Sequence, residues 1–185
     1  MKFDNSWTLF LDRDGVINER EEGGYIKKVE DFSFIPGTIK AIEKLSSIFG
    51  RIVVVTNQAG IGKGLMTEKH LQAIHKHMMK TIDLLDGRID KIYFCSDKPD
   101  SNSPNRKPET GMAMQAKADF PEIEFSRSVI VGDAMSDMEF GARLGMVKVF
   151  IDDGGADSSL KEGIRVDIKP DFQFDSLKSF VDSLG

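Results

Sequence analysis

The stretch FLDRDGV at residues 10–16 decides the fold of this chain. Its apolar start predicts the end of a buried strand, and its glycine predicts a turn directly after two carboxylates. Residues i and i+2 of a strand point to the same face, so Asp12 and Asp14 are expected to converge where the strand ends. Two like charges that close repel each other unless a cation or a shared proton relieves them. A divalent metal ion with a phosphoryl substrate would account for the pair, and a strand that simply ends in an acidic turn is the alternative.

Other apolar runs of the chain also end in polar side chains. The segment VVVTNQ at residues 53–58 ends in a hydroxyl and two amides, and the segment VIVGD at residues 129–133 ends in a carboxylate. Asp137 follows Asp133 by four residues, a spacing that would also suit the N-terminus of a helix. Thr56, taken alone, could merely cap a turn.

Two cations stand directly before a proline at Arg106-Lys107-Pro108. The proline disfavours a helical backbone at the residue before it, so Lys107 is expected on a loop. Taken alone, Lys107 would be an ordinary solvated charge.

The whole chain alternates apolar runs with amphipathic helical patterns, and no repeat or linker interrupts it, so we expect one domain over residues 1–185. Strands that are apolar on both faces predict a parallel sheet of about five strands between two layers of helices, a three-layer Rossmann-like α/β fold. Ligands of such sheets bind beyond the carboxyl ends of the strands, which would gather Asp12, Thr56 and Asp133 in one crevice. The strands are expected at 8–12, 52–56, 91–95, 128–132 and 147–151, and the helices at 38–49, 67–86, 110–120, 136–144 and 174–184.

Local signals refine two of these helices. Thr67 is the expected N-cap of the 67–86 helix, and Ser136 and Glu139 have the spacing of a capping box at the start of the 136–144 helix. The three histidines of the chain lie off the apolar stripe of the 67–86 helix and are therefore expected at the surface; they are His70, His75 and His77.

Composition excludes several classes of function. The net charge of −5 argues against a general binder of nucleic acids or anionic membranes. The single cysteine, Cys95, precludes an intrachain disulfide and fits a reducing compartment. The N-terminal residues lack an apolar signal core, and no run is long enough to cross a membrane. We expect a cytoplasmic monomer whose partner is a small molecule.

An acidic pair, a hydroxyl, a lysine and a second acidic pair, in this order, resemble the signature of the haloacid dehalogenase superfamily of phosphotransferases. The resemblance implies that Asp12 is the nucleophile and Asp14 the general acid and base. It implies Mg²⁺ as the cofactor, bound by Asp12, Asp133 and the backbone carbonyl of Asp14. Thr56 and Lys107 match the groups that hold the transferring phosphoryl oxygens. Asp137 matches a supporting acidic residue, bound through water or to Lys107.

The carboxylate at Asp14 distinguishes the reactions within that superfamily. A P-type ATPase would be expected to carry threonine at this position, and a dehalogenase lacks the aspartate. The resemblance therefore favours hydrolysis of a phosphate ester.

A closer resemblance is to the D-glycero-D-manno-heptose 1,7-bisphosphate phosphatases and the related histidinol-phosphate phosphatases. It rests on the segments DRDGVIN at 12–18, GYI at 24–26, FIPG at 34–37, TNQAGIGKG at 56–64 and RKPETGM at 106–112. By this resemblance Asn57, Gln58 and Arg106 would line the substrate site. The short 18–36 segment leaves no room for a large cap domain, so the expected substrate is a small phosphorylated sugar, with heptose 1,7-bisphosphate as the best guess.

The chain departs from that group at two places. Many members hold a structural zinc with Cys-x-His and Cys-x-Cys, where this chain has Cys95, Asp97, Ser103 and Asn105. One thiol cannot complete such a site, so we predict no structural zinc. The heptose enzymes often carry lysine after the first aspartate of the last motif, where this chain has Ala134.

Three alternatives remain open from the sequence. A histidinol-phosphate phosphatase and a nucleic-acid 3′-phosphatase share the motifs, although the acidic balance argues against the second. A catalytically silent binding domain with the same fold would be expected to lack at least one of Asp12, Asp14, Lys107 and Asp133, and all four are present.

Overall fold

A computed structural model describes residues 2–21, 23–154 and 168–185 of the chain. These residues form a six-stranded, entirely parallel sheet in the order β3-β2-β1-β4-β5-β6. The strands are β1 (Thr8–Leu11), β2 (Arg51–Asn57), β3 (Lys91–Cys95), β4 (Ser128–Gly132), β5 (Val147–Ile151) and β6 (Phe172–Phe174). The predicted three-layer α/β fold is confirmed.

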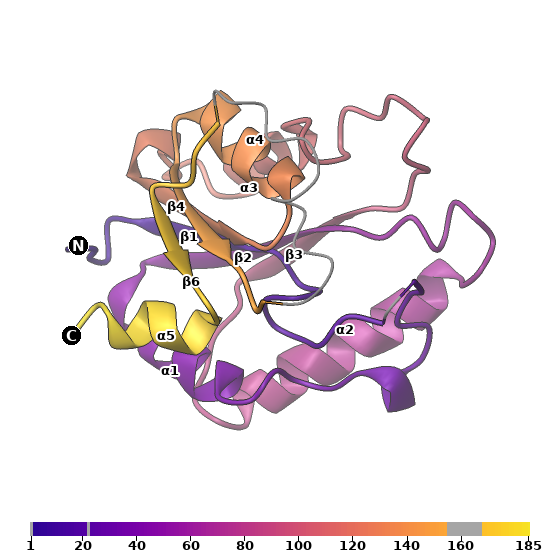
Figure 1. Ribbon diagram of the computed structural model, residues 1–185, viewed down its shortest axis with the longest axis horizontal. Coiled ribbons are helices and arrows are strands. Elements are labelled where there is room, and N and C mark those ends of the chain that lie inside the picture. The colour runs from indigo at the N-terminus through magenta and orange to yellow at the C-terminus, as the bar shows by residue number, and fades with distance from the viewer. Residues whose placement is uncertain (1, 22, 155–167) are drawn as a thin grey trace.

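Helices cover both faces of the sheet (Figure 1). One layer contains α1 (Thr38–Ile48), α2 (Glu68–Asp83) and α5 (Leu177–Asp182), and the other contains α3 (Gly111–Asp119) and α4 (Met135–Leu144). Two short 3₁₀ helices span Val29–Asp31 and Phe125–Arg127. The alternation of a strand divides the core between the layers: Leu9 and Leu11 pack in one cluster with α1, α2 and α5, and Phe10 packs in the other with α3 and α4.

The five predicted strands are confirmed, but the sequence did not predict β6. This strand has only three residues, and Phe172 at its start is exposed. It therefore lacks the buried apolar run by which the other strands were predicted. Because β6 occupies Phe172–Phe174, the last helix begins at Leu177 rather than near residue 174.

The two predicted helix N-terminal signals have different outcomes. Thr67 caps α2 as predicted, because its hydroxyl accepts a hydrogen bond from the backbone N–H of His70 at 3.2 Å. The expected capping box of Ser136 and Glu139 is wrong. The helix α4 begins one residue earlier, and the carboxylate of Asp137 accepts from the backbone N–H of Ala134 at 3.1 Å.

The register of the sheet brings the polar strand ends together. In the parallel ladder Leu11 stands opposite Val54 of β2 and Val131 of β4, so the residues that follow these three positions leave the same edge of the sheet. No large cap is inserted between β1 and α1, where the described residues form loops and one 3₁₀ turn.

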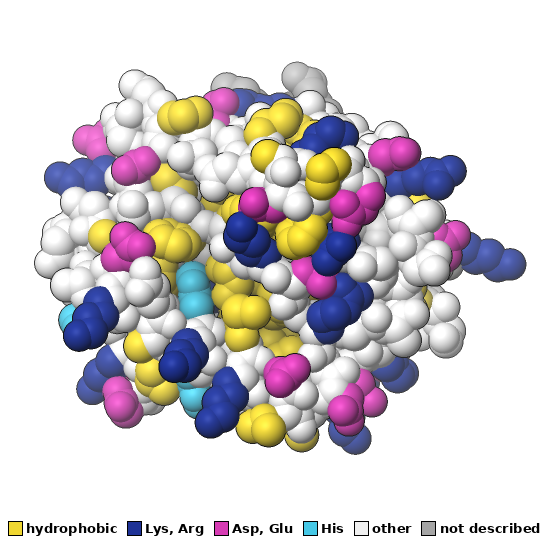
Figure 2. All heavy atoms as spheres, turned by 180° about the vertical axis from the view of Figure 1, so that it is seen from behind, with side chains coloured by type: hydrophobic (Ala, Val, Ile, Leu, Met, Phe, Trp, Pro, Cys, Tyr) yellow, Lys and Arg dark blue, Asp and Glu magenta, His cyan; other side chains and the backbone are white. Residues whose placement is uncertain are grey.

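The surface carries charges of both signs. Lysine, arginine and acidic side chains are interspersed over the face opposite to that of Figure 1, with hydrophobic side chains visible near its middle (Figure 2). None of the helices in the described ranges is long and apolar enough to cross a membrane.

Candidate active site

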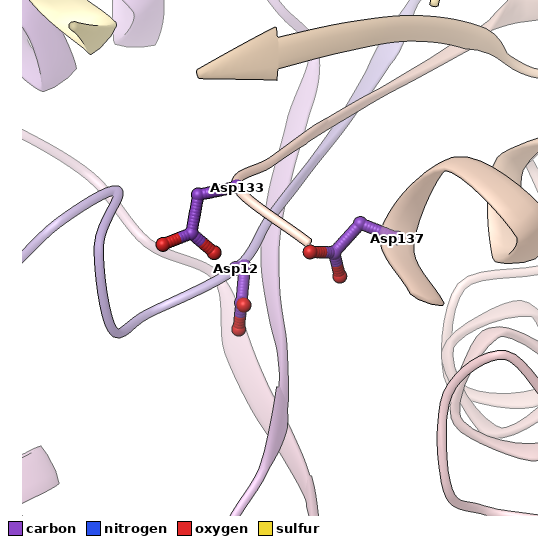
Figure 3. Close-up of side chains that lie close together, drawn as sticks. All are labelled: Asp12, Asp133 and Asp137. Carbon is purple, nitrogen blue, oxygen red and sulfur yellow. The ribbon is translucent and has the colours of Figure 1, made fainter. Parts of the chain in front are cut away.

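Three aspartates meet at the carboxyl edge of the sheet (Figure 3). Asp12 follows β1, Asp133 follows β4 and Asp137 lies in the first turn of α4. One carboxylate oxygen of each lies within 4.8 Å of the others. Such an oxygen-only donor set suits a hard cation such as Mg²⁺, as the sequence predicted for Asp12 and Asp133.

A buried lysine joins two of these carboxylates. The ammonium group of Lys107 lies 3.0 Å from Oδ1 of Asp12 and 2.6 Å from Oδ1 of Asp137, and it donates to the carbonyl of Val55 at 2.7 Å. Its side chain is only 1% exposed, so the interpretation of Lys107 as an ordinary solvated charge is wrong. Burial lowers the pKa of Lys107, but Asp12 and Asp137 outweigh this effect and hold it above its usual value, so the lysine is charged.

The side chain of Asn57 positions this lysine by binding the lysine's backbone. The amide nitrogen of Asn57 donates to the carbonyl of Lys107 at 3.1 Å, and its amide oxygen accepts from the N–H of Lys107 at 3.0 Å. The following Lys107–Pro108 peptide bond is cis. Asn57 therefore fixes the loop that carries the lysine at the end of β2.

The acidic cluster carries more negative charge than its surroundings neutralise. Burial raises the pKa of Asp12 to about 6, with Asp137 and Asp14 adding to the effect and Lys107 opposing it. Burial and the nearby Asp12 raise the pKa of Asp133 to about 8, although Arg20 opposes them. Carboxyl groups with such raised pKa values indicate a site that a divalent cation would stabilise.

Asp14 lies in a separate network of donors. Its carboxylate accepts from Nη2 of Arg13 at 2.8 and 3.0 Å, from the amide of Asn18 at 2.9 Å and from the amide of Gln58 at 2.7 Å. Burial would raise the pKa of Asp14, but Arg13 and these hydrogen bonds outweigh it and hold the pKa below its usual value. The carboxylate is therefore ionised in this arrangement.

Gly15 and Arg20 contact the third aspartate. The guanidinium of Arg20 lies 2.5 Å from Oδ1 of Asp133. Gly15 has a positive φ of 82°, and a Cβ there would lie 1.6 Å from Oδ2 of Asp133. The turn after Asp14 thus passes so close to Asp133 that only glycine fits.

An open cavity of about 1130 Å³ lies over this edge. Its lining includes six of the predicted site residues: Asp12, Asp14, Thr56, Asn57, Lys107 and Asp133. Three predicted residues do not line it: Gln58, Arg106 and Asp137, the last of which contacts Lys107 instead. Gln58 is buried behind it and donates to both Asp14 and the Thr56 hydroxyl, the latter at 3.0 Å. Arg106 donates to the carbonyl of Asp97 at 3.4 Å.

Sequence reasoning missed several residues of this site. Arg13 was passed over although it stands between the two aspartates; it is fully buried, and its guanidinium contacts the Asp14 carboxylate. The expectation of a surface position is wrong for His75, which is 7% exposed and whose Nε2 lies 3.2 Å from Nη1 of Arg13. Lys63, in the 56–64 segment that the sequence analysis singled out, lines the cavity, and the backbone N–H of Gly62 in the same loop donates to the carbonyl of Ser96 at 2.9 Å.

The positions at which the sequence resemblance placed zinc ligands form a hydrogen-bonded cluster. The thiol of Cys95 lies 3.6 Å from a carboxylate oxygen of Asp97 and 3.7 Å from the hydroxyl of Ser103. The backbone N–H of Asn105 donates to the same hydroxyl at 3.4 Å. Side-chain hydrogen bonds thus connect this part of the 96–105 loop to the end of β3.

The sequence of residues 8–172 matches the family described as polynucleotide kinase 3 phosphatase. The chain is 34% identical over 184 residues to the D-glycero-alpha-D-manno-heptose-1,7-bisphosphate 7-phosphatase of Mycobacterium tuberculosis, with 98% of this chain and 93% of the relative covered. This chain belongs to the haloacid dehalogenase-type phosphatase family. The D-glycero-beta-D-manno-heptose-1,7-bisphosphate 7-phosphatase of Pseudomonas putida is also 34% identical, over 84% of this chain and 88% of its own length.

A solved structure of this phosphatase family has the same fold. It is the D,D-heptose 1,7-bisphosphate phosphatase of Bordetella bronchiseptica complexed with magnesium and phosphate, with a TM-score of 0.85 and 26% identity, covering 100% of this chain and 98% of that one. The carboxylate cluster of Asp12, Asp133 and Asp137 is a donor set of the kind that Mg²⁺ requires.

Proposed function

We propose that this chain is a Mg²⁺-dependent phosphatase that hydrolyses a small phosphorylated sugar, with D-glycero-D-manno-heptose 1,7-bisphosphate as its substrate. The observation that carries the proposal is the buried Lys107, which contacts Asp12 at 3.0 Å beside Asp133 and Asp137. The identity to named heptose-bisphosphate phosphatases over almost the whole chain supports the choice of substrate.

Asp12 is the proposed nucleophile. Within the described part of the chain, Lys107 and the backbone N–H of Arg13 both contact its Oδ1, which leaves Oδ2 for attack on phosphorus. In the first step the Oδ2–P bond forms, the P–O bond to the sugar breaks, and the leaving oxygen takes a proton from Asp14. In the second step Asp14 accepts a proton from water while the water oxygen attacks phosphorus and releases inorganic phosphate and Asp12.

The ionised resting state of Asp14 is compatible with both steps. As an ionised carboxylate it can act as the base for water. A phosphoryl dianion bound beside it adds negative charge, which raises the pKa of the carboxyl group and favours the protonated form that the first step needs.

The remaining site residues are proposed to bind the phosphate groups and the metal ion. Lys107 and the Thr56 hydroxyl are proposed to bind the phosphoryl oxygens, with Lys107 kept in place by Asn57 and Asp137. Asp12, Asp133 and the backbone carbonyl of Asp14 would hold Mg²⁺, which would offset the repulsion between the carboxylates and the phosphoryl group. Arg106 is proposed to reach the distal phosphate of the substrate, and Gln58 to orient Asp14 and Thr56 from behind.

A substrate panel tests this function. We expect phosphate release from heptose 1,7-bisphosphate in the presence of Mg²⁺, far less from histidinol phosphate, and none from a 3′-phosphorylated oligonucleotide or in EDTA. Asp12→Asn should abolish turnover, whereas Asp100→Asn, the same change at an exposed loop position, should retain it. Near-wild-type turnover of Asp12→Asn would overturn the covalent mechanism.

A nucleic-acid 3′-phosphatase is the second candidate, because the matching family model is described by that activity. On the face that Figure 2 shows, charges of both signs are interspersed, which does not favour a nucleic-acid surface there. Preference for the oligonucleotide in the panel would reverse the assignment.

We also propose that the chain acts as a single-domain monomer in the cytoplasm, without nucleic-acid or membrane partners and without structural zinc. The parallel sheet through the described residues and the single cysteine support this proposal. Light scattering at micromolar concentration checks the oligomeric state.

A further inference from the structure

A fully buried arginine connects Asp14 to helix α2. The guanidinium of Arg13 holds both oxygens of the Asp14 carboxylate through Nη2, at 2.8 and 3.0 Å. Its Nη1 lies 3.2 Å from Nε2 of His75. Arg13 is 0% exposed, so its orientation depends on these partners rather than on water.

The chemistry of the Arg13–His75 contact fixes the state of the histidine. A guanidinium can only donate hydrogen bonds, so Nε2 of His75 must present its lone pair and the imidazole must be neutral. Burial and the charge of Arg13 lower the pKa of His75 to about 3, which agrees with a neutral ring. His75 is therefore an acceptor for the guanidinium, from a helix far away in the sequence.

The ring of His75 is itself held in place. It lies edge-on to Phe94 of β3, with 6.0 Å between the ring centroids, and it is 7% exposed. A continuous series of contacts thus runs from β3 through His75 and Arg13 to the carboxylate of Asp14.

We propose that His75 is a positioning residue for the phosphatase reaction, acting through Arg13 on the Asp14 carboxylate. This inference rests on the proposed role of Asp14 as acid and base. Burying an arginine is costly unless its donors are paired, so loss of the His75 acceptor would leave Nη1 unpaired and free the guanidinium to reorient. The carboxylate that it holds would then lose its fixed place beside the reacting phosphoryl group.

The dependence of rate on the leaving group separates positioning from mere stability. A sugar alkoxide needs a proton from Asp14 to leave, whereas p-nitrophenolate leaves without one. Single-turnover release of the leaving group should therefore fall about tenfold for the sugar phosphate in His75→Leu, but by less than about twofold for p-nitrophenyl phosphate. His75→Gln, whose amide oxygen can accept from Arg13, should recover most of the loss.

Three further variants complete the test. His77→Leu makes the same substitution at an exposed position of α2 and should change neither rate. Arg13→Lys keeps the charge but cannot span Asp14 and His75, and it should show the same selective loss if His75→Leu fails to fold. Asp14→Asn should lower the rate for the sugar phosphate by roughly 10²–10⁴-fold, which checks the proposed function itself.

Each failure has a different meaning. Equal losses on both substrates in the folded His75→Leu or Arg13→Lys variant, or no recovery in His75→Gln, would overturn the positioning role. An Asp14→Asn variant without a selective loss on the sugar phosphate would instead overturn the proposed role of Asp14.

Discussion

Gly15 occupies a position where the backbone leaves no room for a side chain. We expect Gly15→Ala to displace Asp133, because the added Cβ would lie 1.6 Å from its Oδ2. The variant should need more Mg²⁺ for half-maximal activity and lose roughly 10–100-fold in kcat/KM, by analogy with lost support around a metal ligand. Titration of phosphatase activity with Mg²⁺ measures both effects.

Gly145 provides the matched control. It has a similar positive φ of 68° at the C-terminus of α4, but a Cβ added there would meet no atom within 4 Å beyond its own chain neighbours. Gly145→Ala should therefore cost only the backbone strain of about 1–2 kcal/mol, measured by chemical unfolding, and retain activity. Similar kinetic losses in the two variants would show that backbone strain, rather than contact with Asp133, explains the effect at Gly15.

His75 should make the free energy of unfolding depend on pH. Its pKa is about 3 in the folded protein and 6.5 as the ordinary value, so the unfolded chain binds a proton that the folded chain does not. Acidification below about 6.5 therefore destabilises the fold. Between pH 6.5 and 5.5 this group should contribute a loss of about 1 kcal/mol.

Urea unfolding at several pH values measures this contribution. The slope of stability against pH should be shallower in His75→Gln than in the wild type over this interval, whereas His77→Gln at the exposed position should keep the wild-type slope. Identical slopes in all three proteins would mean that His75 takes up its proton equally in the folded and the unfolded chain, and the neutral buried ring inferred from its contact with Arg13 would then be wrong.

At the level of elements, the sequence predicted what depends on local pattern. Both faces of a strand in a parallel sheet are covered by helices, so a buried strand is an apolar run in the sequence. Five strands were predicted from such runs. Asp12, Asp14 and Asp133 were found because they end those runs. The strand β6 was missed because its stability depends on pairing with β5, as in the register of Ile151 with Phe174, rather than on its own three residues.

Contacts between elements could not be predicted in this way. Whether a histidine on α2 is buried depends on what packs against that side of the helix, and Phe94 and Arg13 come from other parts of the chain. The same holds for Arg20, whose guanidinium contacts Asp133 although the two residues lie far apart in the sequence. Nothing in the local spacing of these residues indicates such partners.

The 96–105 loop is the element where the chain departs from the zinc-ligand pattern that the sequence resemblance implies. Its hydrogen bonds around Cys95 supply local contacts, and one thiol cannot complete a closed zinc site. We expect metal analysis of the purified protein to find no stoichiometric zinc. In Mg²⁺-free buffer a strong chelator should leave the thermal unfolding midpoint unchanged, and a zinc ion that is lost in Cys95→Ser would contradict this prediction.

At the scale of the whole molecule, the acidic balance must be reconciled with an anionic substrate. Among the described residues, eight carboxylate side chains but only three cationic ones line the cavity: Arg20, Lys63 and Lys107. Arg20 and Lys107 are already paired with Asp133 and Asp12. Lys63 is exposed, and its ammonium group lies 5.4 Å from the centroid of the Tyr25 ring. A bisphosphate entering this cavity would therefore find Lys63 as the lining cation that no described carboxylate engages.

This charge distribution predicts how the enzyme distinguishes a bisphosphate from a monophosphate. Lys63→Ala should raise KM for heptose 1,7-bisphosphate about tenfold and change KM for p-nitrophenyl phosphate by less than about twofold, because a charge-assisted hydrogen bond to the distal phosphate is lost. Arg106→Ala should act in the same direction if its guanidinium exchanges the Asp97 carbonyl for that phosphate, and Lys69→Ala on the exposed face of α2 should change neither constant. Steady-state kinetics with both substrates measure these constants. Equal effects of Lys63→Ala on the two substrates would place Lys63 at the reacting phosphoryl group, and the distal-phosphate assignment would then have to rest on Arg106 alone.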